Sequence, residues 1–167
     1  METAKIRLNK LRGFEIISPE QRDKDFKKSY SIKKPKRATR YSAGYDFFAP
    51  YDISLKAGES LAIPTGIRAY MADDEVLKIY PRSGLGFKYH MSLSNSTGII
   101  DGDYYYSDNE GHIFIKIHNG GDKVISIKKH EAFAQGIFQK FLLVDGDTFE
   151  NGAVRNGGFG STTSTSK

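Results

Sequence analysis

Short segments in which hydrophobic and polar residues alternate dominate the middle of the chain. In residues 112–118 an isoleucine occupies every second position, and polar or aromatic side chains occupy the positions between. Residues 77–80 and 125–127 show the same period of two, and residues 61–63 and 136–138 have a similar composition. A period of two is typical of a β-strand with one buried face. The pattern therefore predicts several short strands.

Glycine and proline separate these segments at regular intervals. The breaks fall at Ala57-Gly58, Pro64, Gly66, Pro81, Gly84, Gly98, Gly120-Gly121 and Gly146. Evenly spaced short strands with few helical windows predict an all-β sandwich or barrel. One helix start is predicted at residues 18–21, where Ser18 can cap the helix and Pro19 suits its first position. Because the following residues are polar apart from Phe26, we expect a surface turn there that stays outside the core.

The end of the chain has a different composition. Residues 157–167 contain no aliphatic residue and a single aromatic one, Phe159. Such a segment cannot bury enough apolar surface to become ordered, so we expect a mobile arm. We divide the chain into a β-domain at residues 1–150 and a C-terminal arm at residues 151–167.

Composition limits the compartment and the class of protein. The 167 residues are enough for one domain with a core, and the chain has no cysteine. No apolar run is long enough to cross a membrane, and residues 1–5 lack the apolar stretch of a secretory signal. We expect a cytoplasmic protein, in the host cytoplasm if the chain is encoded by a phage, with no membrane contact.

Basic residues are concentrated in one segment. Residues 22–40 contain nine lysines and arginines and two aspartates, whereas the whole chain has a net charge of only +5. The segment is either a solvated loop or a surface that attracts a polyanion such as a triphosphate, a nucleic acid or an acidic protein. No nucleic-acid recognition motif accompanies it, so we expect no dedicated nucleic-acid binding.

Five segments carry residues suited to phosphate or acid–base chemistry. They are Ala43-Gly44-Tyr45-Asp46, Pro81-Arg82-Ser83-Gly84-Leu85-Gly86, Gly98-Ile99-Ile100-Asp101-Gly102-Asp103-Tyr104, Phe133-Ala134-Gln135-Gly136-Ile137-Phe138 and Arg155-Asn156-Gly157-Gly158-Phe159-Gly160-Ser161-Thr162. Arginine and serine beside glycines suit a phosphate. If extended, Asp101 and Asp103 share a face and raise one another's pKa when desolvated. Taken singly, each segment also has an ordinary interpretation as a turn, a strand or a linker.

Taken in order, the five segments resemble the five motifs of the trimeric dUTPase family, the dUTP pyrophosphatases. The resemblance runs from Arg37 to Thr162, about three quarters of the chain. The basic segment before the first motif is more similar to dUTPases of Gram-positive bacteria or their phages. The resemblance implies a homotrimer of jelly-roll-like β-barrels, with a flexible C-terminal arm that closes over a site shared between subunits. It also implies hydrolysis of dUTP to dUMP and pyrophosphate with Mg²⁺, which keeps uracil out of DNA and supplies dUMP for thymidylate synthesis.

The resemblance implies a role for each matched position. Asp101 is the general base that activates water for in-line attack on the α-phosphorus, and Asp46 contacts magnesium only through water. The positions implied to bind substrate are Arg82, Ser83, Gly84, Asn95, Gly98, Ile99, Ile100, Tyr104, Phe114, Gln135, Arg155, Phe159 and Gly160. Of these, Tyr104 is implied to pack on deoxyribose. From the arm, Arg155 is implied to bind the distal phosphates and Phe159 to cover uracil.

The chain departs from the family pattern in three places. Residues 105–111 lengthen the loop after the third motif, so the match of Phe114 crosses an insertion. Ala132 stands where the fourth motif usually has an arginine, and that cation must come from Arg82, Arg155 or a nearby lysine. Thr163 replaces the usual final glycine of the fifth motif, which affects the flexibility of the arm more than its chemistry.

Two alternatives to a dUTPase stay open at this point. One is a dCTP deaminase-like enzyme, whose relatives share the barrel; the run from Asp101 to Tyr104 favours attack of water on phosphorus instead. The other is a regulatory binding protein that has kept the fold and lost turnover, which Ala132 and the basic segment would suit.

Overall fold

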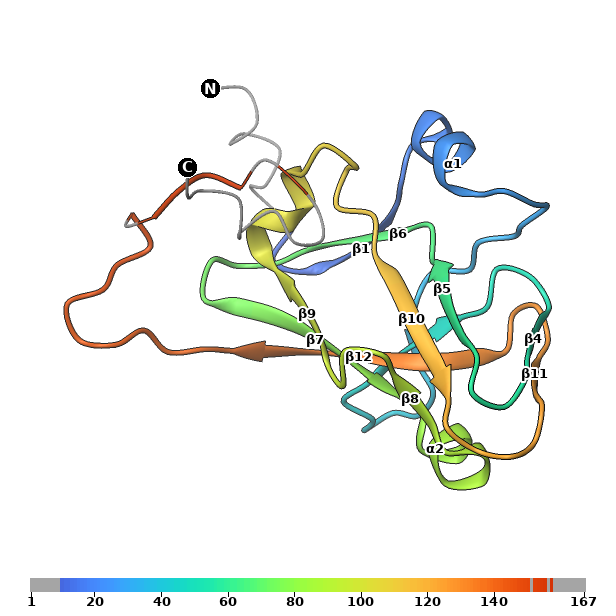
Figure 1. Cartoon of the computed structure of the whole chain (residues 1–167). Helices are drawn as coiled ribbons and strands as arrows, with labels where there is room; N and C mark the ends of the chain where they lie inside the picture. The colour runs from blue at the N-terminus through green and yellow to red at the C-terminus, as the bar shows by residue number, and fades with distance from the viewer. Residues whose placement is uncertain (1–9, 151, 156, 158–167) are drawn as a thin grey trace, which may run out of the picture.

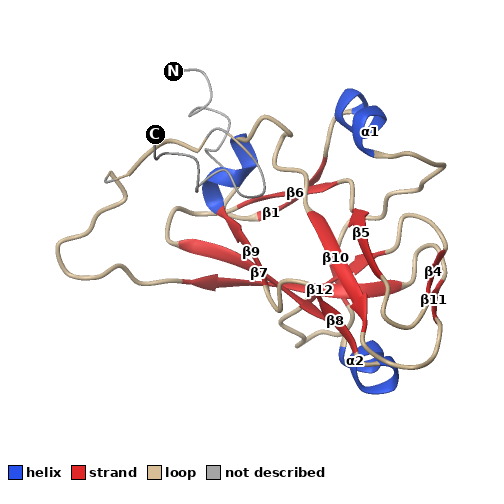
Figure 2. Cartoon of the chain, in the orientation of Figure 1, coloured by secondary structure: helices blue, strands red, loops and turns tan. Residues whose placement is uncertain are grey.

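The computed structural model describes residues 10–150, 152–155 and 157, and the chain is predominantly β-structure there, as predicted (Figures 1 and 2). The strands are β1 (Gly13–Ile16), β2 (Lys36–Arg37), β3 (Tyr45–Phe48), β4 (Ile53–Leu55), β5 (Ser60–Pro64), β6 (Ile67–Tyr70), β7 (Glu75–Pro81), β8 (Met91–Leu93), β9 (Gly98–Asp101), β10 (Phe114–Asn119), β11 (Ile125–Ile127) and β12 (Ala132–Lys140). The helices are α1 (Pro19–Asp25), α2 (Ser83–Tyr89) and the 3₁₀-helix η2 (Gly102–Tyr106). None of the helices in the described residues is long and apolar enough to span a membrane.

Antiparallel pairing joins the strands into four small sheets. The largest has the order β2-β3-β12-β7-β9, and the others are β5-β10-β8, β1-β6 and β11-β4. Non-sequential neighbours such as β12 and β7 show that the sheets are assembled by long-range contacts. The chain after β12 swings away from the sheets and returns toward η2, at the left of Figure 1.

The alternating segments bury the faces that the sequence pattern predicts. Ile113 and Ile117 are fully buried and Ile115 is 3% exposed, whereas Lys116 between them is exposed. These isoleucines meet buried residues of the other sheets, among them Phe47, Ile63, Leu77 and Phe133, in one hydrophobic core. Burial of apolar surface contributes about 25 cal/mol per Å² to the free energy of folding, so this core is the main source of stability.

The helix start at Ser18 is confirmed, and no residue of α1 belongs to the hydrophobic core cluster, as expected of a surface element. Ser18 accepts a hydrogen bond from the backbone N–H of Gln21, and α1 follows for seven residues. Gln21 and Phe26 are both only 7% exposed. A loop about ninety residues further along the chain accounts for this, because Glu110 accepts hydrogen bonds from Ser18 and His112 stacks near Phe26.

Candidate functional site

Two aspartates meet an arginine where β9 ends. Asp101 is the last residue of β9, and Asp103 lies in η2. Arg155 donates from Nη2 to Asp101 Oδ2 at 2.6 Å and from Nε to Asp103 Oδ1 at 3.0 Å. The Asp101–Asp103 segment is not extended, because the chain turns into η2 at Gly102. The two carboxylates nevertheless face the same guanidinium.

Burial makes Asp101 easier to protonate. Partial desolvation raises the pKa of Asp101, the Arg155 cation lowers it, and the neighbouring Asp103 raises it again, with a net upward shift. A carboxyl group whose pKa lies closer to neutrality is a stronger base toward water. The geometry of Asp101 therefore suits a general base.

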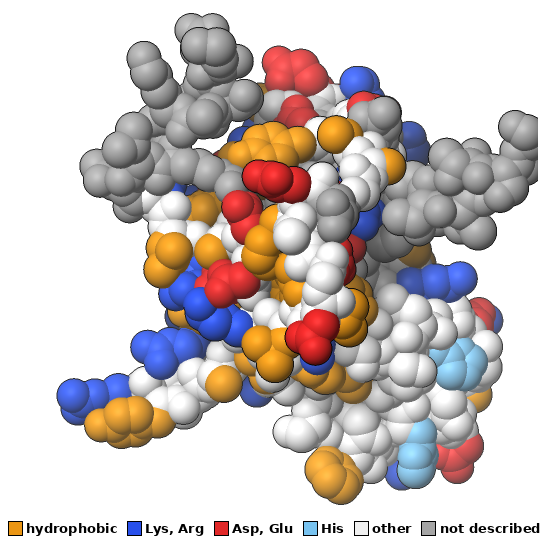
Figure 3. Space-filling model, turned by 90° about the vertical axis from the view of Figure 1, so that its left-hand side faces the viewer, with side chains coloured by type: hydrophobic (Ala, Val, Ile, Leu, Met, Phe, Trp, Pro, Cys, Tyr) orange, Lys and Arg blue, Asp and Glu red, His pale blue; other side chains and the backbone are white. Residues whose placement is uncertain are grey.

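A cavity of about 500 Å³ opens beside this pair. Besides Asp101, Gly102, Asp103 and Arg155, its lining consists of Asp73, Tyr106, Phe141 and Phe149. The face in Figure 3 mixes acidic and exposed hydrophobic side chains. The sequence analysis missed these four lining residues. The sequence did contain a signal for Phe141 and Phe149, because both are large apolar residues beyond the last predicted strand. In the structure their side chains are 38% and 57% exposed.

A second, apolar cavity of about 590 Å³ lies over the same strand, β9. Five residues predicted from the sequence line it, namely Asn95, Gly98, Ile99, Ile100 and Phe114. The other walls come from Ala62, Ile79, Leu93, Ser94, Thr97, Ile115 and Lys116. A volume of this size suits a small organic ligand such as a nucleoside.

Gly98 allows β9 to approach β7 at the edge of this cavity. A Cβ atom at position 98 would lie 2.9 Å from Cβ of Ile79, its cross-strand partner. Any side chain there would push the two strands apart, so the glycine is needed for the close packing of the cavity wall.

Tyr104 does not line the cavity. Its side chain is only 5% exposed, and its hydroxyl donates to the carbonyl oxygen of His112 at 2.7 Å. The amide of Asn109 donates in turn to the Tyr104 hydroxyl at 2.9 Å. Tyr104 thus packs against the core, and the Arg155 guanidinium lies 5.9 Å from the centroid of its ring; contact of this ring with deoxyribose stays a prediction.

The other predicted phosphate residues gather on a separate face. Asp46 on β3 pairs with Gln135 on β12, so the two side chains share a face. Arg82 Nε lies 3.5 Å from Asp46 Oδ1, and the Gln135 amide donates to the carbonyl of Pro81 at 3.2 Å. This phosphate face is therefore defined by Asp46, Arg82 and Gln135.

The segment after Arg82 is helical. Arg82 occupies the N-cap position of α2, and Ser83 and Gly84 form its exposed first turn. The helix ends at His90, which adopts a left-handed conformation with φ 52°. Ser83 and Gly84 remain accessible beside the phosphate face.

Lysines of the basic segment approach the phosphate face. Ala132 pairs with Phe48 across β12 and β3, and Lys33 Nζ lies 4.1 Å from the centroid of the Phe48 ring. Lys36 is the cross-strand partner of Asp46. Lys33 therefore lies near Ala132, the position that lacks the usual arginine.

The carboxylate pair and the phosphate face lie at opposite ends of β7. Val76 pairs with Asp101, and Pro81 directly precedes Arg82. Five residues of strand separate these positions, which corresponds to about 17 Å at roughly 3.3 Å per residue. Within one chain, Asp101 and Arg82 cannot both contact the same phosphorus atom.

Asp46 is the residue that the sequence analysis connects with magnesium. The described residues contain no group of three or more histidine, cysteine, aspartate or glutamate side chains suited to a metal. Asp46 is 9% exposed and ion-paired with Arg82. This arrangement suits an acceptor for metal-bound water, which is the role expected for an ion that keeps its waters and binds phosphates.

Part of the arm lies outside the described residues. Phe159 and Gly160 fall there, as does most of the segment predicted to be mobile. Arg155 is described, and within the chain its guanidinium contacts the two aspartates and lies 5.9 Å from the centroid of the Tyr104 ring.

The fold and cavities define a β-protein with a cavity of nucleoside size next to a partly buried carboxylate. The dUTPase family model matches residues 30–163, and the chain belongs to the dUTPase family. The deoxyuridine 5'-triphosphate nucleotidohydrolase of Lactococcus lactis subsp. lactis (strain IL1403) is 45% identical over 154 residues, which is 92% of this chain and 98% of that protein. These matches confirm the family resemblance.

Solved structures agree with this assignment. The dUTPase of Streptococcus mutans has a TM-score of 0.67 and 39% identity, and the match covers 80% of this chain and 99% of that one. A mutant dUTPase from phage phi11 of S. aureus, described with a structural Mg(II) ion, has a TM-score of 0.63. It is 19% identical, and the match covers 84% of this chain and 97% of that one, so it supports the fold alone.

Proposed function

We propose that this chain hydrolyses dUTP to dUMP and pyrophosphate. The observation that carries the proposal is the continuity of β9, whose residues Gly98 to Ile100 form a wall of the apolar cavity and whose last residue is Asp101. A nucleoside seated in the cavity would direct its phosphates toward the end of the strand. Asp101 and the α-phosphorus would then lie next to one another without any rearrangement of the sheet.

Asp101 acts as the general base in this proposal. Its carboxylate removes a proton from a water molecule, and the water oxygen attacks the α-phosphorus in line with the bond to the bridging oxygen. That bond breaks, pyrophosphate leaves, and Asp101 is left protonated. Partial burial, which raises the pKa of Asp101, makes it an effective acceptor of this proton.

In this proposal Arg155 stays paired with Asp101 until the substrate binds. Its guanidinium pairs with Asp101 and Asp103 in the free chain, and phosphate oxygens offer it a bidentate anion. We assign Arg155 to the distal phosphates of bound dUTP, which frees Asp101 to contact water. The remainder of the arm, with Phe159 and Gly160, would close over the uracil ring.

The phosphate face comes from a second copy of the chain in this proposal. The separation of about 17 Å along β7, at roughly 3.3 Å per residue, keeps Arg82 and Asp101 of one chain apart. A homotrimer of jelly-roll-like barrels brings Arg82, Ser83, Gly84 and Gln135 of one subunit to the cavity of another. Asp46 would hold a magnesium ion through water when the triphosphate is bound, and the ion would supply positive charge that neutralises the phosphates.

Selectivity for uracil comes from the cavity. Polar backbone groups of the turn between β8 and β9 can pair with the uracil edge, and Asn95 lies in this turn. A cytosine would leave those groups unpaired, which gives strong rejection. Phe114 contributes an aromatic wall to the same cavity.

A panel of nucleotides tests the function directly. Pyrophosphate release is measured with dUTP, dCTP, dTTP and UTP, each with and without magnesium. We expect magnesium-dependent release from dUTP above all others. Formation of a uracil nucleotide from dCTP would favour the deaminase, and binding of dUTP without turnover would favour a regulatory protein.

Replacement of Asp101 separates dUTP binding from catalytic turnover. We expect Asp101→Asn to retain dUTP binding and to lose turnover by about 100-fold or more, because a positioned base contributes about 10²–10⁴-fold. Binding is measured by calorimetry and turnover by pyrophosphate release. Turnover at the wild-type rate in this variant would refute the assignment of the base.

A further inference from the structure

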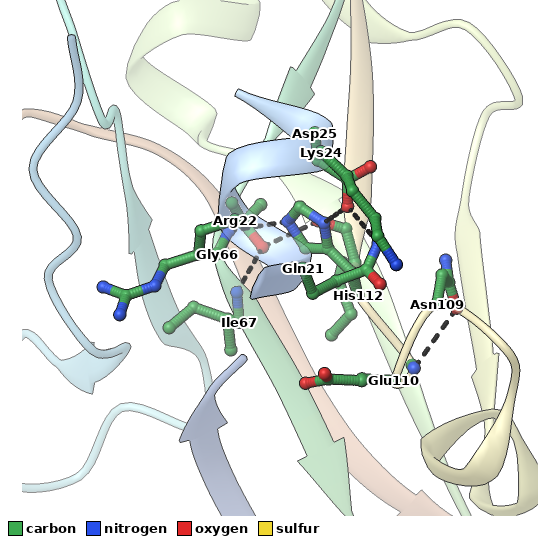
Figure 4. Close-up of polar contacts among 12 residues, drawn as sticks. Gln21, Arg22, Lys24, Asp25, Gly66, Ile67, Asn109, Glu110 and His112 are labelled. Carbon is green, nitrogen blue, oxygen red and sulfur yellow. Dashed lines mark hydrogen bonds and ion pairs between the residues drawn. The ribbon is translucent and has the colours of Figure 1, made fainter. Parts of the chain in front are cut away.

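A histidine–aspartate pair joins the helix α1 to the segment before β10, and Figure 4 shows the His112 ring facing Asp25. The His112 side chain is fully buried, and its Nδ1 lies 2.6 Å from Asp25 Oδ2 at the end of α1. On the other side of the ring, the backbone N–H of Gly66 donates to Nε2 at 2.8 Å. The helix α1 precedes the part of the chain that the family model matches.

These contacts determine the tautomer of His112. A backbone N–H can only donate, so Nε2 must be the acceptor and the ring proton must reside on Nδ1. Nδ1–H then donates to the Asp25 carboxylate, which also accepts a hydrogen bond from Gln21 at 2.8 Å. The imidazole is therefore held from opposite sides by α1 and by the loop between β5 and β6.

The same histidine contacts two residues beside the proposed nucleotide site. Its ring centroid lies 4.4 Å from that of Phe114, which lines the apolar cavity. The backbone carbonyl oxygen of His112 accepts a hydrogen bond from the Tyr104 hydroxyl at 2.7 Å. Tyr104 belongs to η2, which begins directly after Asp101. A shift of His112 would thus be transmitted to Phe114 in the cavity wall and to η2, which follows Asp101.

We propose that Asp25 and His112 form a positioning pair that fixes Phe114 and Tyr104, so that α1 supports the nucleoside end of the substrate site. The inference rests on the proposed function, since it assigns the apolar cavity to the nucleoside. Neither Asp25 nor His112 contacts the substrate. The phosphate face lies at the other end of β7 and has no contact with the pair in the described structure, so nucleoside binding and phosphate binding should respond differently.

The test uses four forms of the full chain: the wild type, Asp25→Ala, Asp25→Asn and Ile125→Val. For each, kcat and KM are measured for dUTP with magnesium, together with inhibition constants for dUMP and for inorganic triphosphate. Ile125 is fully buried in β11, outside the cavity lining. Its replacement by valine serves as a control for lost stability and should lower the melting temperature by about 2–4 °C.

We expect Asp25→Ala to raise the KM for dUTP and the inhibition constant of dUMP about tenfold, because a hydrogen bond to a charged group is lost. kcat and the inhibition constant of inorganic triphosphate should change much less, because Arg82 and Gln135 on the phosphate face lie at the other end of β7. Asp25→Asn should lie between, since its amide oxygen can still accept from Nδ1. Ile125→Val should leave both inhibition constants unchanged.

The pair would be purely structural if Asp25→Ala kept the wild-type constant for dUMP, or weakened dUMP and inorganic triphosphate equally. Should Asp25→Ala fail to fold, as circular dichroism would reveal, the same comparison on Asp25→Asn decides the question. A wild-type chain that releases no pyrophosphate from dUTP would instead refute the proposed function, and this outcome is distinct from an effect of Asp25.

Discussion

Gly44 leaves the space that the Gln135 side chain occupies. A Cβ atom at position 44 would lie 2.3 Å from Gln135 Oε1 and 3.2 Å from its Cδ. These atoms are the flexible end of a side chain, so the amide would move and the backbone would stay. Gly44→Ala therefore displaces Gln135 from the phosphate face without changing any atom of Gln135 itself.

The size of the effect follows from the contacts involved. The hydrogen bond from Gln135 to the carbonyl of Pro81 would be lost, at about 1 kcal/mol of stability. For a chain of this length that corresponds to a melting temperature lower by about 2–4 °C. A hydrogen bond from the amide to a charged phosphate contributes about 1.5–3 kcal/mol, so kcat/KM for dUTP should fall by roughly 10- to 150-fold.

A double-mutant cycle tests whether Gly44 acts through Gln135. Steady-state kinetics with dUTP are measured for Gly44→Ala, Gln135→Ala and the double variant. If the methyl group acts by displacing the amide, the double variant should lose no more activity than Gln135→Ala alone. Additive losses, or wild-type activity in Gly44→Ala, would refute this reasoning.

Two further predictions concern pH. Asp103→Asn removes a charge that raises the pKa of Asp101, so the acidic limb of the pH profile of kcat/KM should shift to lower pH; a shift to higher pH would contradict the pairing of the two carboxylates. Burial lowers the pKa of His112 below its ordinary value of about 6.5, and this outweighs the opposing effects of Asp25 and Glu110. The unfolded chain then takes up the proton first, so the melting temperature should fall as pH decreases from 7.5 to 5.5, and His112→Gln should weaken that dependence. A wild-type melting temperature that is constant over this range would contradict the buried neutral histidine.

Local pattern was enough to predict most of the secondary structure. Alternation of isoleucine with polar residues predicted β10, and Ser18 with Pro19 predicted the start of α1. Such features depend on the nearest neighbours in the sequence, because a strand needs one apolar face and a helix needs its first N–H groups capped. The cavity residues Asn95 and Gly98 to Ile100 were predicted from the family resemblance, which rests on motifs that are continuous in the sequence.

The sequence by itself thus determined the strand content, and it predicted which side chains are reactive. Only the tertiary structure decided that Asp101 and Arg82 lie at opposite ends of β7, that Tyr104 is buried, and that α1 reaches His112. Each of these depends on strand register or on a contact between residues far apart in the chain. A register shift of one residue turns every side chain to the other face, and no local pattern encodes which distant partner satisfies a buried polar group.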